Sequence, residues 1–249
     1  MKSTFTDLHT HILPGVDDGA KTLEEALQML RMQKINGVER VALTPHFYPL
    51  REELQVFLEK RQKAYDKLLS NWDGENMPQL QLGAEVHYSP ELVEKELCSL
   101  TIGQGRYLLL ELSNMTVPAH MEEVLRIMLE QGLMPVLAHV ERCIYFREQP
   151  DRLVRLVEQG ALAQITAAAL INKRTRHFAE ICLKKNVAQI VASDIHTLAE
   201  DAVCLGNVAN RTDGALIANG ESFARAVWDN MPHPTFAVSP IKKNILGYC

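Results

Sequence analysis

Nine side chains that could bind a metal ion lie at the ends of apolar runs along the chain, or in the loop after the first run. All are histidines or carboxylates: His9, His11, Asp18, His46, Glu85, Glu111, His139, Asp194 and His196. If the apolar runs are parallel strands, their carboxyl ends meet on one face of a barrel or sheet, so ligands far apart in sequence converge there. A ligand set of His, Asp and Glu without Cys suits divalent ions such as Zn²⁺, Mn²⁺ or Fe²⁺. The sequence therefore predicts a metal centre on that face.

Two spaced pairs carry most of this prediction. His9 and His11 lie at positions i and i+2 of a predicted strand, so both side chains point to the same side. Asp194 and His196 repeat that spacing at the last strand. One such pair alone is more simply explained by ordinary buried side chains, but two pairs, one opening and one closing the strand series, favour a metal site.

The other candidates are weaker when taken singly. Glu85 and Glu111 end apolar runs, where a carboxylate is costly to bury unless it is paired, protonated or bound to a metal. Either one could instead form a salt bridge. His46 follows Thr44-Pro45 and by itself reads as a loop or helix-cap histidine. The metal interpretation rests on the whole set.

Arg142 lies three residues after His139 and could bind an anionic group through two parallel hydrogen bonds. An exposed pair with the neighbouring Glu141 explains it equally well. The chain has no C-x₅-R loop, no G-x-S-x-G motif and no P-loop. Hydrolysis of a phosphate or carboxylic ester would therefore depend on metal-activated water.

Composition limits the class of protein. The 249 residues are 47% hydrophobic and 23% charged, which is ordinary for a globular protein. A net charge of −5 without a basic block argues against duplex nucleic acid or an anionic membrane as the main partner. We see no signal peptide, and no run approaches the roughly 20 apolar residues of a membrane span. The five cysteines form no CxxC motif, so we expect reduced thiols in a cytoplasmic protein.

The elements that must position the candidate ligands alternate between strands and helices. Most of the predicted strands are apolar at consecutive positions, as parallel strands covered on both faces are. They are Phe5–His9, Val38–Thr44, Gln79–Glu85, Arg106–Leu112, Met134–Val140, Ala161–Thr166 and Val187–Asp194. This alternation predicts an α/β fold.

Capping signals define the predicted helices. Thr22 and Glu25 form a T-x-x-E capping box, and that helix ends at Asn36-Gly37. Pro118 suits the first turn of another helix, which stops at Gly132. The remaining helices are predicted at Leu54–Leu69, Pro150–Gln159, Arg174–Lys185 and Glu221–Asn230. Without a long linker or repeat, residues 1–249 are expected to form a single domain.

Five segments, taken in this order, resemble the polymerase and histidinol phosphatase (PHP) superfamily. They are DLHTHILPGVDDG at 7–19, TPH at 44–46, GAE at 83–85, PVLAHVER at 135–142 and ASDIH at 192–196. Within that superfamily they look most similar to the bacterial manganese-dependent protein-tyrosine phosphatases of the CpsB, CapC and YwqE type, which belong to capsule and exopolysaccharide operons.

The resemblance implies a distorted seven-stranded (β/α)₇ PHP barrel with three metal ions, Mn²⁺ being expected first and Fe or Zn as alternatives. One ion would be held by His9, His11, Glu85 and Asp194. Glu85 would bridge to a second ion, which Glu111 and His139 also hold. Asp18, His46 and His196 would hold the third, and Asp18 is chosen over Asp17 because the second Asp of DDG matches the family ligand.

The implied activity is hydrolysis of phosphotyrosine in a protein, expected to be the tail of a bacterial tyrosine kinase that controls polysaccharide synthesis. Arg142 would bind the phosphate, and His46 or a metal-bound water would be the proton donor. Two alternatives stay open: a PHP-type small-molecule phosphoesterase such as histidinol phosphatase, and a non-catalytic metal- or kinase-binding protein.

The sequence departs from the phosphatases at two places. No Arg follows Asp194-Ile195-His196 until Arg211, whereas the phosphatases usually carry one a few residues after this motif. The sixth predicted strand reads ITAAAL at 165–170, where small polar residues are common. The metal ligands are intact, so these differences bear on the substrate pocket.

Overall fold

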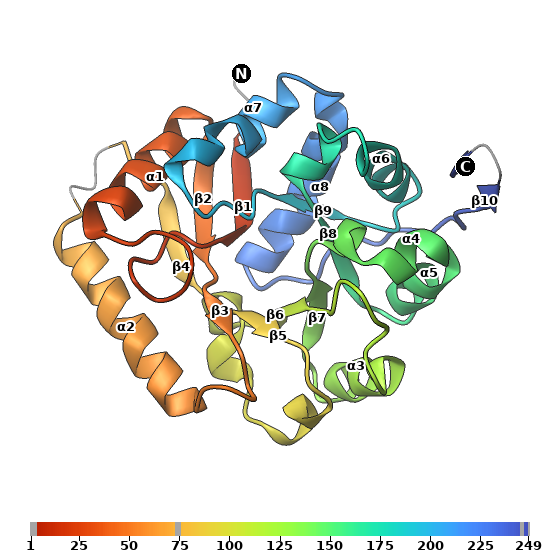
Figure 1. The fold of residues 1–249 in the computed structure, drawn as a ribbon, viewed down its shortest axis with the longest axis horizontal. Helices are drawn as coiled ribbons and strands as arrows, with labels where there is room; N and C mark the ends of the chain where they lie inside the picture. The colour runs from red at the N-terminus through yellow and green to blue at the C-terminus, as the bar shows by residue number, and fades with distance from the viewer. Residues whose placement is uncertain (1–3, 73–75, 245–246, 249) are drawn as a thin grey trace.

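Apart from a short antiparallel hairpin of the last two strands, the strands of the computed structural model run parallel to their neighbours and curl around a common centre, with helices outside them (Figure 1). Residues 4–72, 76–244 and 247–248 are described. A three-stranded sheet has the order β1 (Phe5–Thr10), β2 (Val38–Leu43) and β4 (Gln79–Leu82). A six-stranded sheet has the order β3 (His46–Phe47), β5 (Glu85–His87), β6 (Tyr107–Glu111), β7 (Met134–Leu137), β8 (Leu162–Thr166) and β9 (Ile190–Ala192).

Short breaks divide two of the predicted strands between the sheets. Thr44-Pro45 separates β2 from β3, and Gly83-Ala84 separates β4 from β5. The backbone stays connected across both breaks, because the Gly83 amide donates to the Leu43 carbonyl at 2.9 Å and the Glu85 amide donates to the Pro45 carbonyl at 3.1 Å. The observed architecture is a mixed α/β fold with a curled parallel sheet, and the expected count of seven strands stays a prediction.

The first and last strands also meet. The Asp194 amide donates to the His9 carbonyl, and the His11 amide donates to the Ile195 carbonyl, both at 2.9 Å. Thr10 and Ile195 form a parallel bridge. This seam brings the HxH and DxH motifs, which are more than 180 residues apart in sequence, onto neighbouring backbone segments.

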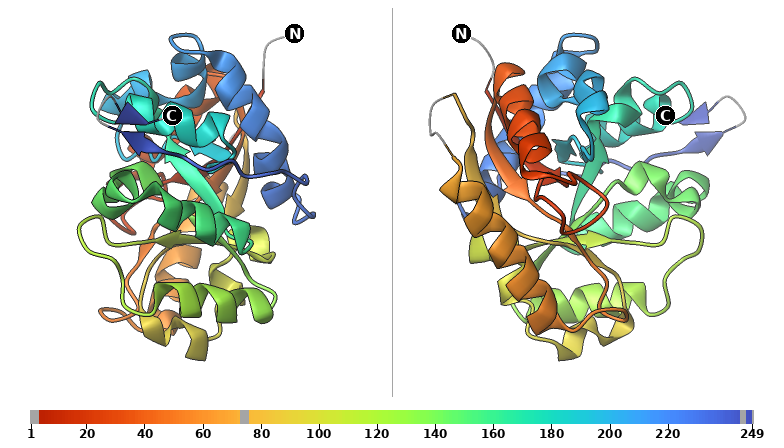
Figure 2. Two further views of the ribbon diagram at one scale, coloured as in Figure 1. Left: turned by 90° about the vertical axis from the view of Figure 1, so that its right-hand side faces the viewer. Right: turned by 60° about the vertical axis from the view of Figure 1, so that its left-hand side comes forward.

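The helices pack around the outside of the curled sheet, as the two further views in Figure 2 show. They are α1 (Leu23–Ile35), α2 (Leu54–Ser70), α3 (Met121–Glu130), α4 (Ile144–Glu148), α5 (Pro150–Glu158), α6 (Arg176–Lys184), α7 (Leu205–Ala209) and α8 (Gly214–Trp228). A short hairpin, β10 (Lys243–Asn244) with β11 (Gly247–Tyr248), follows them. None of the described helices is long and apolar enough to cross a membrane.

The last long helix differs most from its prediction. The prediction places it at 221–230, whereas α8 begins at Gly214 and ends at Trp228. Glycine inside a helix is unfavourable in isolation, so the glycines of this segment hid its first two turns. A Cβ at Gly220 would approach the Gln189 carbonyl oxygen to 2.7 Å. The residue is therefore required for the close packing of α8 on the chain leading into β9.

Candidate metal centre

The HxH motif brings two histidines into the mouth of the curled sheet. His9 and His11 lie on or just after β1, and both are fully buried. Their Nε2 atoms are 3.1 Å apart. Each Nε2 is also close to Glu85 Oε2, at 3.2 and 3.3 Å, and to Asp194 Oδ1, at the same two distances. Two nitrogens and two carboxylate oxygens from three strand ends thus surround one small volume.

Hydrogen bonds behind the rings determine which nitrogen faces this volume. His9 Nδ1 is 3.2 Å from Gln164 Oε1, which also accepts the His139 backbone N–H at 3.0 Å. Because that amide oxygen can only accept, His9 Nδ1 must be the donor. His11 Nδ1 is 2.7 Å from Asp17 Oδ2. In both neutral rings, the lone pair of Nε2 therefore points toward Glu85 and Asp194.

The charge on Asp17 supports this assignment for His11. Burial raises the pKa of Asp17, but hydrogen bonding and charge attraction from His11 outweigh it and lower the pKa to about 2. Asp17 is therefore ionised at neutral pH and accepts the His11 Nδ1–H. The Gly19 and His46 amides also donate to it, at 2.9 and 3.0 Å. Asp17 thus orients a candidate ligand from outside the cluster.

A second group of side chains lies on the side of Glu85 that faces Glu111. His139 Nε2 is 2.8 Å from Glu85 Oε1 and 3.8 Å from Glu111 Oε1. His46 Nδ1 is 2.9 Å from Glu85 Oε2 and 3.9 Å from Glu111 Oε2. Glu85 therefore stands between the first group and this one, where a bridging ligand would stand.

The third group lies at the outer edge. Asp18 Oδ1 is 3.7 Å from His46 Nε2 and 3.5 Å from His196 Nε2. The loop that carries Asp18 folds back tightly over β1, because a Cβ at Gly19 would lie 1.8 Å from the His11 carbonyl oxygen. Glycine is thus required after the two aspartates, and the turn directs Asp17 inward to His11 while Asp18 stays exposed beside the two histidines.

This arrangement fits divalent metal ions. Ligand atoms about 2.0–2.2 Å from one ion lie roughly 3.0–3.5 Å from each other, which matches the spacing of the first group. Without a cation, the lone pairs of His9, His11, Glu85 and Asp194 face one another. Within the described part of the chain, the buried Glu85 Oε2 and His46 Nδ1 atoms lie 2.9 Å apart without the geometry of a hydrogen bond, and neither has another hydrogen-bond partner. Atoms that lack donors in a dry site are expected where a metal ion supplies the missing positive charge.

The pKa values of His9, His11 and Glu85 are shifted in directions that indicate too little positive charge in the cluster. Burial alone would lower the pKa of His9, but Glu85 and Asp194 raise it above its ordinary value. The pKa of His11 is likewise raised well above 6.5, against the effect of burial, by Asp17, Asp194 and Glu85. Burial would raise the pKa of Glu85, but the surrounding imidazoles, His9 first, hold it well below its usual range. In the metal-free protein, protons on the histidines are the cations that balance these carboxylates.

Two of the candidate ligands have unusual backbone conformations. His139 has φ +32° and Asp194 has φ +56°, in the left-handed region that residues other than glycine rarely adopt. Such strain persists where the surrounding structure requires it, often at functional sites. The turn at His139 leads directly into the short 3₁₀ helix Val140–Arg142. Arg142 Nη2 there donates to Asp194 Oδ2, which places the guanidinium at the border of the first group.

All nine ligands predicted from the sequence thus lie in one connected cluster. Sequence reasoning missed the residues that orient them: Asp17, Gln164, Glu200 and His87. Glu200 accepts the backbone N–H groups of His196 and Thr197, and His87 Nδ1 is 3.0 Å from Glu111 Oε2. In the sequence, only the spacing of Glu85 and His87 at i and i+2 could have indicated His87.

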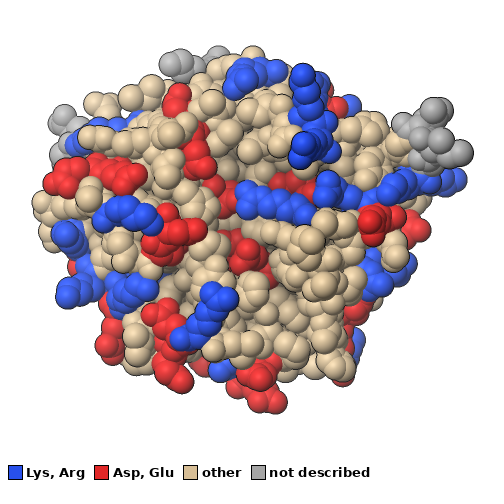
Figure 3. All heavy atoms as spheres, viewed as in Figure 1, with Lys and Arg blue, Asp and Glu red and all other residues tan. Residues whose placement is uncertain are grey.

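Charged side chains are unevenly distributed over the surface. On the face drawn in Figure 3, Asp and Glu side chains gather near the centre, and Lys and Arg side chains extend from there to one side.

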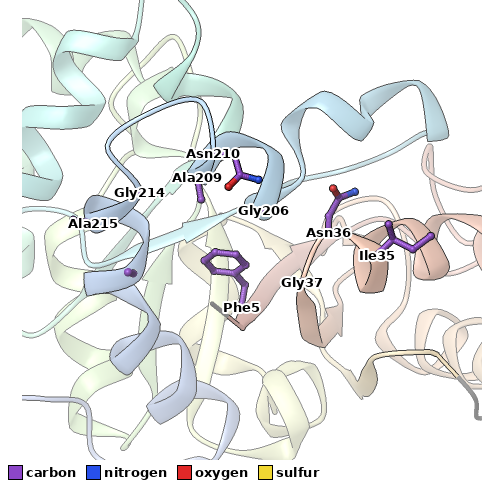
Figure 4. Close-up of a pocket in the computed structure, with 10 residues that line it drawn as sticks. Phe5, Ile35, Asn36, Gly37, Gly206, Ala209, Asn210, Gly214 and Ala215 are labelled. Atoms are coloured by element: carbon purple, nitrogen blue, oxygen red, sulfur yellow. The ribbon is translucent and has the colours of Figure 1, made fainter. Parts of the chain in front are cut away.

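A cavity of about 500 Å³ lies away from the metal-binding cluster. It is at the amino ends of β1 and β2, where Phe5, Asn36 and Gly37 line it together with residues of α7 and α8 (Figure 4). Its lining has no His, Asp, Glu, Cys or Lys. This cavity therefore has none of the side chains on which the chemistry of the cluster depends.

The comparisons with known proteins agree with the site. Residues 5–216 match the family model described as capsular polysaccharide synthesis, CpsB/CapC. The chain belongs to the CpsB/CapC family. The tyrosine-protein phosphatase YwqE of Bacillus subtilis is 32% identical over 201 residues, which cover 77% of each chain. The tyrosine-protein phosphatase CpsB of Streptococcus agalactiae is 26% identical over 247 residues, covering 88% of this chain and 98% of that one.

A solved structure extends the similarity to the fold. The work describing the crystal structures of YwqE from Bacillus subtilis and CpsB from Streptococcus pneumoniae calls them unique metal-dependent tyrosine phosphatases. One of its chains superposes with a TM-score of 0.81 at 25% identity, covering 95% of this chain and 99% of the other. The curled parallel sheet is therefore the fold of this family.

Proposed function

We propose that this protein is a metal-dependent protein-tyrosine phosphatase of the CpsB/CapC family. One observation carries the proposal: a buried cluster of imidazole and carboxylate acceptors, at the spacing that metal ions require, in a chain whose relatives are named tyrosine-protein phosphatases. We further propose that it acts in the cytoplasm on a bacterial tyrosine kinase that regulates capsule or exopolysaccharide synthesis.

The finer features of the site belong to the same proposal. The metal is Mn²⁺, held as three ions. His9, His11, Glu85 and Asp194 hold the first, and Glu85, Glu111 and His139 the second. Asp18, His46 and His196 hold the third. The fold is the seven-stranded PHP barrel, in which β2 with β3 and β4 with β5 each count as one interrupted strand.

When bound, the ions supply an activated water and neutralise charge on the phosphoryl group. The residues of the chain hold and orient the reactants. Arg142 uses one nitrogen on Asp194, and its side chain is 43% exposed, so the remaining N–H groups can bind phosphate oxygens. The leaving tyrosinate has a conjugate-acid pKa of about 10 and needs little help from a general acid. Because both ring nitrogens of His46 face carboxylates of the cluster, we assign this residue to metal binding rather than to proton donation.

The cysteines are not part of this mechanism. Of the five, Cys98, Cys143, Cys182 and Cys204 are free thiols, and Cys249 lies outside the described residues. Burial raises the pKa of Cys143 to about 12 and also raises those of Cys182 and Cys204, so these thiols are not nucleophilic thiolates at neutral pH. Cys98 is exposed, but its pKa is raised by a hydrogen bond with Glu96.

A substrate comparison tests the proposal. The purified protein is stripped with EDTA, dialysed, reloaded with Mn²⁺, and assayed on a phosphotyrosine peptide, the matching phosphoserine peptide and L-histidinol phosphate. We expect hydrolysis only after reloading and fastest for phosphotyrosine. Iodoacetamide treatment of the reloaded enzyme should leave the rate unchanged. A preference for histidinol phosphate, or no hydrolysis of any of the three, would refute the assignment.

A further inference from the structure

A row formed by Tyr48 and His87 lies two residues beyond the metal-binding layer of His46 and Glu85. In the parallel pairing of β3 with β5, His46 is opposite Glu85 and Phe47 is opposite Val86. In the pairing of β5 with β6, His87 is opposite Glu111. The next step along β3 is Tyr48, and its ring centroid is 5.3 Å from that of His87 and 5.4 Å from that of His46. The strand register thus places an aromatic ring directly beyond His46 and Glu85.

Tyr48 is held in place but takes no part in the metal cluster. The Cζ atom of Arg51 lies 4.9 Å from the centre of the Tyr48 ring, a cation–π contact, and the Arg51 amide donates to the Tyr48 carbonyl at 2.9 Å in the same turn. Among the described residues, no hydrogen-bond partner is found for the Tyr48 hydroxyl. The ring is partly exposed and lies among polar side chains rather than in the apolar core. Packing of the core does not explain it.

Tyr48 lies on the side of the metal-binding layer toward which the ester group of a bound phosphate would point. A phosphate bound at the layer of His46 and Glu85 must direct its ester group outward, because the other side of this layer is the closed interior of the sheet. Beside His46 and Glu111, the side chains that follow along these strands are Tyr48 and His87. Aromatic rings interact favourably in edge-to-face or offset geometry, and a tyrosine ester presents such a ring at that position.

We propose that Tyr48 is a substrate-binding residue that forms the wall of a subsite for the aromatic ring of an aryl phosphate. This inference rests on the proposed phosphatase function and adds the residue that contacts the leaving group. In this subsite, Arg51 covers one part of the Tyr48 ring and His87 lies beside it, so the ring is oriented before the substrate arrives. The subsite selects for the aryl group, and the metal layer binds the phosphate.

Inorganic phosphate separates these two contributions. It occupies the phosphate position without reaching the ring subsite, so its inhibition constant reports on the metal layer alone. In Tyr48→Ala, the KM for a phosphotyrosine peptide should rise between about two- and tenfold, as loss of one aromatic contact predicts. The Ki of inorganic phosphate and the metal content should not change. Tyr48→Phe keeps the ring and should restore the KM to within about twofold of the wild-type value.

Tyr65 provides a matched control, because it is a partly buried tyrosine on α2 that packs at the edge of the core. Tyr65→Ala should leave the KM unchanged. A wild-type KM in Tyr48→Ala, with an active wild-type enzyme, would overturn the subsite and leave the phosphatase assignment intact. A rise in the Ki of phosphate equal to the rise in KM would also overturn it, because Tyr48 would then act on the phosphate position. A wild-type enzyme that does not hydrolyse the peptide would overturn both proposals.

Discussion

Two polar clusters follow one another along the same face of β1, and they differ in how hydrogen-bond donors and acceptors are paired. Asp7 lies near the amino end, and its carboxylate accepts from Ser193 Oγ at 2.5 Å, Gln33 Nε2 at 2.8 Å and the Ser193 amide at 3.0 Å. Two residues later, His9 Nε2 faces carboxylate oxygens of Glu85 and Asp194. Both clusters are buried, but the first pairs donors with acceptors and the second gathers acceptors.

The difference separates a structural role from a metal-binding one. Asp7 connects β1 to the segment after β9, and donors of the protein itself form hydrogen bonds to both of its carboxylate oxygens. Glu85 is equally buried, yet its Oε2 forms no hydrogen bond of good geometry and faces the ring nitrogens of His9, His11 and His46. Burial of a carboxylate is therefore not itself a sign of a metal site. The sign is a buried carboxylate oxygen that faces several imidazole nitrogens and a second carboxylate, because a cation can compensate such a group of acceptors.

The largest expected effect comes from removing one carboxylate from each cluster. Glu85→Ala should reduce turnover at least about a hundredfold, since even residues that only orient metal ligands contribute that much. Its metal content should also fall. Asp7→Ala should instead lower the free energy of unfolding by about 1–3 kcal/mol, because it leaves buried donors without an acceptor.

Chemical denaturation and elemental analysis of both variants measure this contrast. Asp7→Ala protein that is still folded should retain its metal and most of its turnover. Equal metal loss in the two variants would remove the distinction between the clusters.

Arg142 tests the border of the metal-binding cluster. Arg142→Lys should lower kcat/KM about ten- to a hundredfold, because an ammonium cannot replace a guanidinium that contacts Asp194 and phosphate together. Metal content should stay unchanged. Arg126 is a matched control, since it is an exposed arginine on α3 that pairs only with Glu130 among the described residues. A lysine variant with wild-type kcat/KM would rule out the phosphate-binding role of Arg142.

The smallest effect is a difference in pH dependence. In the metal-free protein, the folded-state pKa values of His9 and His11 are raised above their unfolded values near 6.5. Their stabilising contribution is therefore complete below pH 6.5 and is lost as the pH rises through the raised values. In the Mn²⁺ form, metal displaces these protons, so the stabilisation by metal should grow over the same range.

Thermal unfolding of the metal-free and Mn²⁺ forms, measured from about pH 6.5 upward, tests this difference in pH dependence. The Tm of EDTA-treated protein should fall as the pH rises, while the increase in Tm caused by Mn²⁺ should become larger. Parallel pH profiles with and without Mn²⁺ would show that protons and metal do not compete for these nitrogens.

The sequence predicted that the candidate ligands lie together because their places at the ends of apolar runs can be recognised in it. A polar residue that ends an apolar run, such as Asp194, is expected at the carboxyl end of a strand, and parallel strands share that edge. Glu85 instead begins β5, after the break in the predicted strand. The family resemblance then distinguished Asp18 from Asp17. In the structure, the two indeed have different neighbours, His46 and His196 for Asp18 and the ring of His11 for Asp17.

The supporting residues could not be predicted in this way. Gln164 lies within the strand LAQIT and looks like any strand residue, yet it fixes the tautomer of His9 across 155 positions of sequence. The break between β4 and β5 is hidden in a continuous run of residues, because its cause is the pairing of Gly83 and Glu85 with the chain around Pro45. Both features depend on long-range contacts that have no local pattern.

The cluster around Glu85 is expected to hold metal ions, and the number of ions per folded chain is the direct measurement of this. Wild-type protein and Glu85→Ala are dialysed against Mn²⁺, freed of excess metal, and analysed for metal per folded chain. We expect more than one ion per chain in the wild type and fewer in the variant. Wild-type protein that holds no metal, or a variant that holds as much as the wild type, would contradict it.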